Sequence, residues 1–336
     1  MGRDNLRALH AIVMVLLVLS GLLVGVRQAT TVAAEQPAYS PRDTLSWPGS
    51  PDPRDAAMLP LSAFDGRLAA HAYLVREITS IAIYDPASNR VYRGGDAGPI
   101  AGASLSKVLM AVIALRQFEQ RGAGEDEIAS VESLIYPTIA YSDNDYANEV
   151  WALIGRQPAV AEFVAQTGLT GFSAPDPWDW GQISATAPDW AILFAMLGSG
   201  ELLNQRNTAA ILSMMDDVIE EHRWGVLAER EDSVSYGKNG WYMDEDNAWD
   251  WRVNSAGFVS VAEPDHAVTP RVVVVMTRYP ADEGMSYGVE LATRVTDRVV
   301  TCTHTQHART TLNQRSASCT SNRETSMLMD RVHRIW

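Results

Sequence analysis

The 336-residue sequence predicts an α+β fold, because strand-like and helix-like runs share the same stretch of chain. Short runs rich in β-branched and aromatic residues, which are typical of strands, lie at Thr79–Asp85, Phe258–Val261 and Arg271–Thr277. The apolar run from Val108 to Leu115 is long enough for a buried helix, and Gly102 before it suits a turn into the helix start. The residues from Pro280 to Val300 favour a second, closing helix.

Length and charge narrow the class of protein. About 240 residues lie between the two ends of the chain, enough for one domain with an internal subdomain. The net charge is −14, and no cluster of basic residues could neutralise phosphates, so we expect no nucleic-acid partner. The sequence shows no glycine-rich phosphate loop and no internal repeat, and we expect no cofactor.

Residues 1–34 predict an export signal. Two arginines precede an apolar run at positions 11–26, whose sixteen residues fall between a signal-peptide core and a full membrane span. Val32-Ala33-Ala34 offers a small-residue cleavage site, so we expect an extracytoplasmic protein whose signal is removed. Arg27 directly after the run leaves a second hypothesis open, in which residues 11–26 remain as a membrane anchor.

The rest of the chain divides into three parts. Five prolines in residues 35–56 favour a linker, residues 57–300 form the main domain, and residues 301–336 form a tail rich in Thr, Ser and Arg. The tail holds the only two cysteines, Cys302 and Cys319. In an exported chain they could close a disulfide loop, and two free thiols are the alternative. Their surroundings fit no standard zinc spacing, so we expect no metal.

Lysine occurs only twice, at Lys107 and Lys238. The sequence has 27 lysines and arginines in total, so 25 of them are arginine. Arginine stays protonated at any workable pH, whereas a buried or crowded lysine can lose its proton. The two positions that keep lysine are therefore candidates for proton transfer.

Lys107 ends the motif Ser104-Leu105-Ser106-Lys107. On a helix, Ser104 and Lys107 at i and i+3 share one face. A neutral amine there could take the hydroxyl proton, while backbone N–H groups of the first turn face a developing anion. Ser104 is thus a candidate nucleophile, with a helix N-cap as the alternative. Ser106 is the rival hydroxyl, but it lies next to Lys107 and points elsewhere on the helix.

Two further motifs follow, Ser142-Asp143-Asn144 and Lys238-Asn239-Gly240. Together with Ser-x-x-Lys they resemble, in type and order, the motif set of serine β-lactamases and penicillin-binding proteins. Chance gives this ordered set with a probability of roughly a few in ten thousand at average composition. The likeness to class A β-lactamases covers about residues 57–300, and its further segments are Ile81–Pro86, Ile139–Leu169 and Thr186–Ala191.

The resemblance implies an antiparallel sheet flanked by helices and joined to an all-helical subdomain, with the active site in the crevice between them. It implies that Ser104 is the nucleophile and Lys107 the base. Ser142, assisted by Lys238, would pass a proton to the leaving nitrogen. The implied substrate-binding residues are Asn144, Asn239, Gly240 and Trp241, and the backbone N–H groups of Ser104 and Trp241 would form the oxyanion hole.

The chain departs from the class A pattern in the loop that should hold the deacylation base. A glutamate in this loop is accepted as activating the deacylating water, yet residues 170–184 contain none. Asp176 and Asp179 are the candidate substitutes, with loop capping as the alternative. We expect the loop's tryptophans to pack and pin the loop rather than to stack on substrate. Asn239 also replaces the usual Thr or Ser, which affects recognition of a substrate carboxylate.

These features predict an exported serine hydrolase, a monomer, that forms an acyl-enzyme with β-lactams and deacylates slowly. One alternative is a penicillin-binding D,D-peptidase that acts on the D-alanyl peptides of peptidoglycan. Another is a non-catalytic cell-envelope module of the same fold that binds peptidoglycan stems. The two lysines and two motif serines argue against the module, and the missing glutamate argues for it.

Overall fold

The computed structural model describes residues 51–69, 78–95, 98–231, 233–244, 250–261 and 270–311. The predicted signal or anchor at residues 1–34, the first part of the predicted linker and Cys319 lie outside these ranges. No helix within the described ranges combines the length and the hydrophobicity that crossing a membrane requires.

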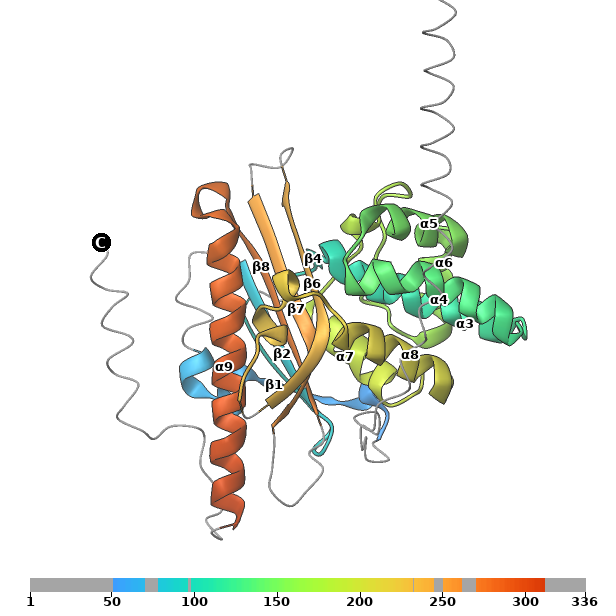
Figure 1. The fold of residues 1–336 in the computed structure, drawn as a ribbon. Helices are drawn as coiled ribbons and strands as arrows, with labels where there is room; N and C mark the ends of the chain where they lie inside the picture. The colour runs from blue at the N-terminus through green and yellow to red at the C-terminus, as the bar shows by residue number, and fades with distance from the viewer. Residues whose placement is uncertain are drawn as a thin grey trace, which may run out of the picture. The chain divides into compact units, whose positions relative to one another are not determined.

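A six-stranded sheet forms the centre of the described fold (Figure 1). Its order is β1-β3-β2-β8-β7-β6, and all neighbours are antiparallel except β1 and β3, which run parallel. The strands are β1 (Ala57–Pro60), β2 (Ile78–Asp85), β3 (Arg90–Gly95), β6 (Ser233–Asp244), β7 (Asp250–Val261) and β8 (Arg271–Pro280). A second, two-stranded sheet joins β4 (Ile100–Ala101) to β5 (Ser184–Ala185).

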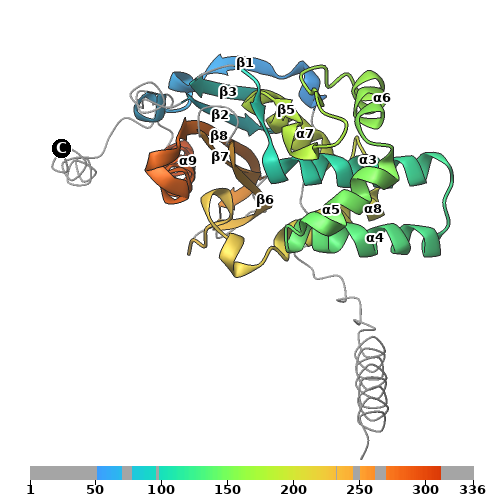
Figure 2. The ribbon, with the colours of Figure 1, turned by 90° about the horizontal axis from the view of Figure 1, so that it is seen from above.

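The central strands are buried on both faces. Along β8, Val272 and Val274 belong to one core cluster, whereas Val273 and Val275 belong to the other. Helix α7 (Ala187–Gly198) packs in the first cluster and α9 (Gly284–Thr311) in the second, so these helices cover opposite faces of the sheet (Figures 1 and 2). A strand buried on both faces has an uninterrupted apolar run, which explains why the sequence predicts β8.

The other helices lie together beyond the β6 edge and the α7 face of the sheet (Figure 2). They are α3 (Ser106–Gln120), α4 (Glu125–Ala140), α5 (Asn144–Ile154), α6 (Gln157–Thr167) and α8 (Gln205–Asp216). Helix α3 runs through the core, with every residue from Val108 to Leu115 buried, as the apolar run predicts. Helix α5 begins where the Asp143 carboxylate accepts two backbone N–H groups, and it ends at Gly155, whose φ of 92° suits glycine.

Several boundaries differ from the predictions. Strand β7 begins at Asp250 rather than near Phe258, because its first half buries polar side chains and so lacks an apolar pattern. The predicted end of the closing helix near Val300 is wrong, since α9 continues to Thr311. Cys302 is a residue of this helix that is fully buried in the core and disulfide-bonded, so a domain boundary after residue 300 would cut through packed structure.

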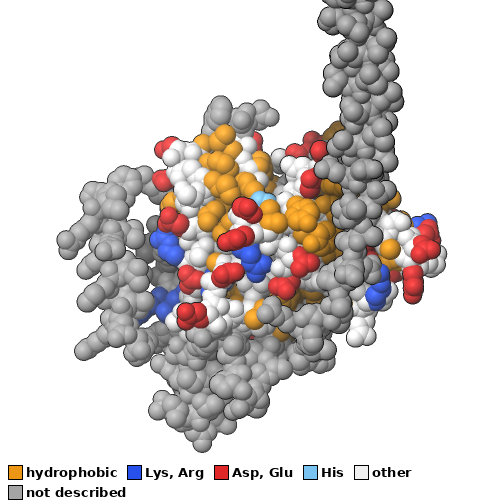
Figure 3. Space-filling view, in the orientation of Figure 1, with side chains coloured by type: hydrophobic (Ala, Val, Ile, Leu, Met, Phe, Trp, Pro, Cys, Tyr) orange, Lys and Arg blue, Asp and Glu red, His pale blue; other side chains and the backbone are white. Residues whose placement is uncertain are grey.

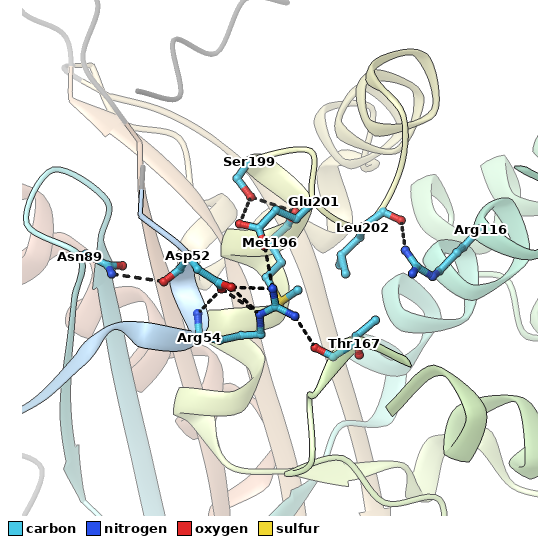
Figure 4. Close-up of polar contacts among 9 residues, drawn as sticks. All are labelled: Asp52, Arg54, Asn89, Arg116, Thr167, Met196, Ser199, Glu201 and Leu202. Carbon is cyan, nitrogen blue, oxygen red and sulfur yellow. Dashed lines mark hydrogen bonds and ion pairs between the residues drawn. The ribbon is translucent and has the colours of Figure 1, made fainter. Parts of the chain in front are cut away.

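The predicted linker also ends too late, because residues 52–55 already belong to the fold (Figure 4). The Arg54 guanidinium pairs with the Asp52 carboxylate, and its Nη1 donates to the carbonyl of Thr167 at the end of α6, at 2.8 Å. The Asn89 side chain donates to the carbonyl of Asp52 at 3.2 Å, and Glu201 lies 3.5 Å from Arg54. This short segment therefore links the sheet edge to α6 and to the loop after α7.

Replacing Arg54 with alanine is expected to lower the free energy of unfolding by about 1 kcal/mol. Exposed ion pairs contribute ~0.2–1 kcal/mol, and the carbonyl of Thr167 loses a charged donor as well. Denaturant titration of the whole chain measures the change. Arg294→Ala is the matched control, because its pair with Glu290 is exposed and local, and it should change stability by less. Equal effects of the two variants would contradict a linking role for Arg54.

Candidate active site

Ser104 lies in a 3₁₀ turn, η4 (Ala103–Leu105), that leads directly into α3. The residue before it, Ala103, has a φ of 50°, a left-handed conformation that is uncommon for a residue with a side chain. The N-cap of α3 is Leu105, so the alternative reading of Ser104 as the N-cap does not hold. Ser104 is half-buried, whereas the rival hydroxyl of Ser106 is fully buried and has no hydrogen-bond partner among the described residues.

Lys107 lies in the first turn of α3, fully buried, and its amine faces the Ser-Asp-Asn motif. Its Nζ donates to the backbone carbonyl of Ser142, to Ser142 Oγ at 3.2 Å and to Asn144 Oδ1 at 2.8 Å. Within the described part of the chain, Ser104 Oγ is not one of its hydrogen-bond partners. Burial lowers the pKa of Lys107 to about 7, while the nearby Asp143 carboxylate raises it by a smaller amount.

Lys238 reaches the same hydroxyl from β6. Its Nζ donates to Ser142 Oγ at 2.9 Å and to the carbonyl of Asn239 at 2.8 Å, and its side chain is fully buried. Burial and the charge of Lys107 both lower the pKa of Lys238 well below its usual value. The Ser142 hydroxyl thus bridges the two lysines, which come from segments 131 residues apart in sequence.

Strand β6 approaches η4 so closely that only glycine fits at position 240. An ideal Cβ there would lie 2.7 Å from the backbone nitrogens of both Ser104 and Leu105. The Asn254 side chain of β7 fixes the chain before η4 by donating to the carbonyls of Ala101 and Gly102 at 2.9 and 3.2 Å. Two backbone segments, one carrying Ser104 and the other Gly240 and Trp241, therefore lie side by side, as an oxyanion hole between them requires.

The Asn239 side chain does not face this space. It is 1% exposed, and its Nδ2 donates to the carbonyls of His222 and Trp224 at 2.8 and 2.9 Å. The amide nitrogen is therefore engaged by these two carbonyls and the amide oxygen is buried, so the side chain is not available to a substrate, in contrast to the prediction. The Trp241 ring packs beside the rings of His222 and Trp224, with centroids 4.9 and 5.9 Å away.

His222 is a titratable group near the site that no sequence motif singles out. Burial first, and then the charge of Lys238, lower the pKa of His222. Its Nδ1 is buried and has no hydrogen-bond partner in the described residues. Burial and the nearby Lys238 charge together favour a neutral His222 imidazole. A single histidine outside any motif gives no sequence pattern from which its place near the site could be predicted.

The two aspartates of the predicted deacylation loop serve as caps. Asp176 Oδ1 accepts the N–H of Trp178 at 2.7 Å, and Asp179 Oδ1 accepts the N–H of Gly181 at 2.8 Å. This geometry corresponds to the capping alternative. The residue of this loop that reaches the site is Trp180, whose ring lies 4.9 Å from Lys107 Nζ.

Other aromatic side chains near the motifs remain exposed. Trp178 is 73% exposed and stacks under the Arg156 guanidinium, 4.2 Å from its ring, while Tyr141 beside Ser142 is 49% exposed. On the face of the molecule in Figure 3, hydrophobic side chains are likewise interspersed with acidic and basic ones.

Comparisons with known proteins give one matching family model and several solved structures of similar fold. Residues 123–303 match the family model described as the β-lactamase enzyme family, a range that includes Ser142 and Lys238 but begins after Ser104 and Lys107. No curated protein matches the chain.

Several solved structures have a similar fold. The TLA-1 extended-spectrum β-lactamase is 13% identical, with 71% of this chain and 99% of that chain covered and a TM-score of 0.61. PBP-A is 18% identical, with 74% and 98% covered and a TM-score of 0.60. A β-lactamase from Sphaerobacter thermophilus is 20% identical, with 70% and 94% covered and a TM-score of 0.55. At these identities the likeness shows the fold, and it confirms the predicted fold class.

The two lysines should titrate at unusually low pH, and their scarcity makes this directly measurable. In a sample with isotope-labelled lysine, NMR will show two side-chain signals, and the Lys107 signal should shift with an apparent pKa of about 7. Asp143→Asn removes the charge that raises this pKa, so it should lower the midpoint further. A Lys107 signal that stays protonated up to pH 10 would contradict the site as described.

Proposed function

The chain belongs to the β-lactamase enzyme family, and on this basis we propose that it is an exported serine hydrolase that forms an acyl-enzyme with β-lactams or related D-alanyl amides. The observation that carries the proposal is the position of Ser142 Oγ, 3.2 Å from Lys107 Nζ and 2.9 Å from Lys238 Nζ. A hydroxyl that bridges two buried amines can pass a proton from one to the other.

In the proposed acylation, Ser104 Oγ bonds to the carbonyl carbon of the substrate while neutral Lys107 takes the hydroxyl proton. The backbone N–H groups of Ser104 and Trp241 stabilise the oxyanion. The carbon–nitrogen bond then breaks, and the leaving nitrogen receives a proton through Ser142. Asn144, whose Oδ1 accepts from Lys107, would orient both the lysine and the substrate amide.

Deacylation is proposed to be slow. Residues 170–184 contain no glutamate, and the two aspartates of the loop are engaged by loop N–H groups. The lack of an available deacylation base is also compatible with the alternative function, a penicillin-binding D,D-peptidase. PBP-A shares the fold, and one PBP-A structure, of a mutant, is an acyl-enzyme complex with penicillin G. A non-catalytic module, by contrast, would have no need of two lysines with lowered pKa values.

Intact-mass measurement after a short pulse of penicillin tests the nucleophile. One equivalent should add to the wild-type chain and none to Ser104→Ala, and the adduct should persist for minutes after removal of free penicillin. Ser106→Ala is the matched control and should label normally. Labelling of Ser104→Ala at the wild-type level would contradict the assignment, and fast loss of the wild-type adduct would contradict slow deacylation.

Lys107→Arg should reduce the acylation rate by roughly 10²-fold or more, the usual scale of base catalysis. Arginine keeps the charge but cannot lose its proton. In the wild type the rate should rise as pH increases through about 7, because the neutral amine becomes the main form above the pKa. The variant's residual rate should lack this rise. Near-normal acylation by Lys107→Arg would show that the lysine acts only as a cation.

A further inference from the structure

Within the loop of residues 170–184, the indole of Trp180 is the side chain that lies over Lys107. Trp180 begins a short 3₁₀ turn, η5 (Trp180–Gln182), which packs against both η4 and α3. Its ring centroid lies 4.9 Å from Lys107 Nζ, and the side chain is half-buried. The ring therefore occupies the loop side of the site, where a deacylation base would have to approach.

Hydrogen bonds from α5 and α6 hold the loop in this position. Trp180 Nε1 donates to Asn148 Oδ1 at 2.9 Å, and Trp151 Nε1 donates to the carbonyl of Pro177 at 3.0 Å. The Gln157 amide donates to the carbonyl of Ala174. All three anchors come from helices packed into the core, so the position of the ring is determined by the fold rather than by a mobile loop.

The other end of η5 is tied to the sheet. The Tyr242 hydroxyl of β6 donates to Gln182 Oε1 at 3.4 Å, and the Asp179 carboxylate caps the turn through the N–H of Gly181. The turn thus spans from α5 to β6, the strand that carries Lys238. A turn fixed at both sides can exclude water from what lies beneath it.

We propose that Trp180 is a positioning residue that closes the loop side of the site over Lys107 and keeps water from an ester formed on Ser104. The inference rests on the proposed function. In this proposal the acyl-enzyme persists for two reasons. The loop lacks a carboxylate that could act as the deacylation base, and the anchored Trp180 ring occupies the side from which the hydrolytic water would approach.

The chemistry that the ring blocks is ester hydrolysis. A water oxygen bonds to the acyl carbon, its proton passes to a base, and the bond from that carbon to Ser104 Oγ breaks as the serine regains a proton. With the ring in place, the water and its base would have to displace the indole to approach Lys107 from this side.

The test compares Trp180→Glu with Trp180→Gln, two side chains of nearly equal size. Both remove the ring and admit water, but only glutamate adds a base. The adduct formed by a penicillin pulse is followed by intact mass after removal of free penicillin. Trp180→Gln should lose the adduct several-fold faster than the wild type does. Trp180→Glu should lose it roughly 10²-fold faster than Trp180→Gln does, because that is the usual scale of general-base catalysis. Trp180→Phe, which keeps a ring, should retain the adduct.

A second measurement does not depend on acylation. In Trp180→Gln, water reaches Lys107, so its lysine NMR signal should titrate at higher pH than in the wild type. Asn148→Ala should change the titration in the same direction, because it releases the ring without removing it. If the wild type forms no adduct, the proposed function fails, and this titration decides the shielding by Trp180 separately. Adduct lifetimes and a Lys107 titration that match the wild type in a folded Trp180→Gln would overturn the inference.

Discussion

A single hydroxyl shared by two buried amines is the interaction on which this site depends. Ser142 Oγ bonds to Lys107 and Lys238, and two ammonium groups so close together and so far from water cannot both remain charged at low cost. Burial is the main cause of the lowered pKa of each lysine, and the charge of Lys107 lowers the pKa of Lys238 further. Because Lys107 comes from α3, Lys238 from β6 and Ser142 from the turn before α5, the arrangement exists only when the helices and the sheet are assembled.

A close approach of two backbone segments and one buried side chain hold these parts together. Position 240 has no room for a Cβ, and Asn254 bonds to two carbonyls just before η4. Ala103 adopts a left-handed conformation that costs of order 1–3 kcal/mol in comparable residues, and such strain persists where the surroundings leave no alternative. The strained residue directly precedes Ser104. The packing of the surrounding fold therefore offsets the strain at Ala103 and holds the Ser104 hydroxyl in its position.

The sequence predicted those parts of the fold in which the local pattern and the tertiary environment agree. Strands β2 and β8 and the first ten residues of helix α3 are buried and appear as apolar runs. By contrast, β1 and β3 are short, and β7 buries polar residues such as Asn254 and Ser255. The motifs identified the lysines and Ser142 because their chemistry is tied to residue type. The orientations of the Asn239 and Trp180 side chains could not be predicted, because each depends on a hydrogen-bond partner elsewhere in the chain. Asn239 donates to carbonyls of the η6–η7 segment (Glu220–Leu227), and Trp180 donates to the side chain of Asn148.

The near absence of lysine has a consequence for the chemical modification of this protein. A typical protein carries many amines on its surface, and reagents such as activated esters or aldehydes react there without affecting function. In this chain both lysines are buried side by side at one serine, so apart from the α-amino group there is no harmless amine to modify. Any lysine acetylation or amine-directed crosslinking that succeeds must first have opened the site, and the extent of such a reaction would report how often the helices and the sheet separate.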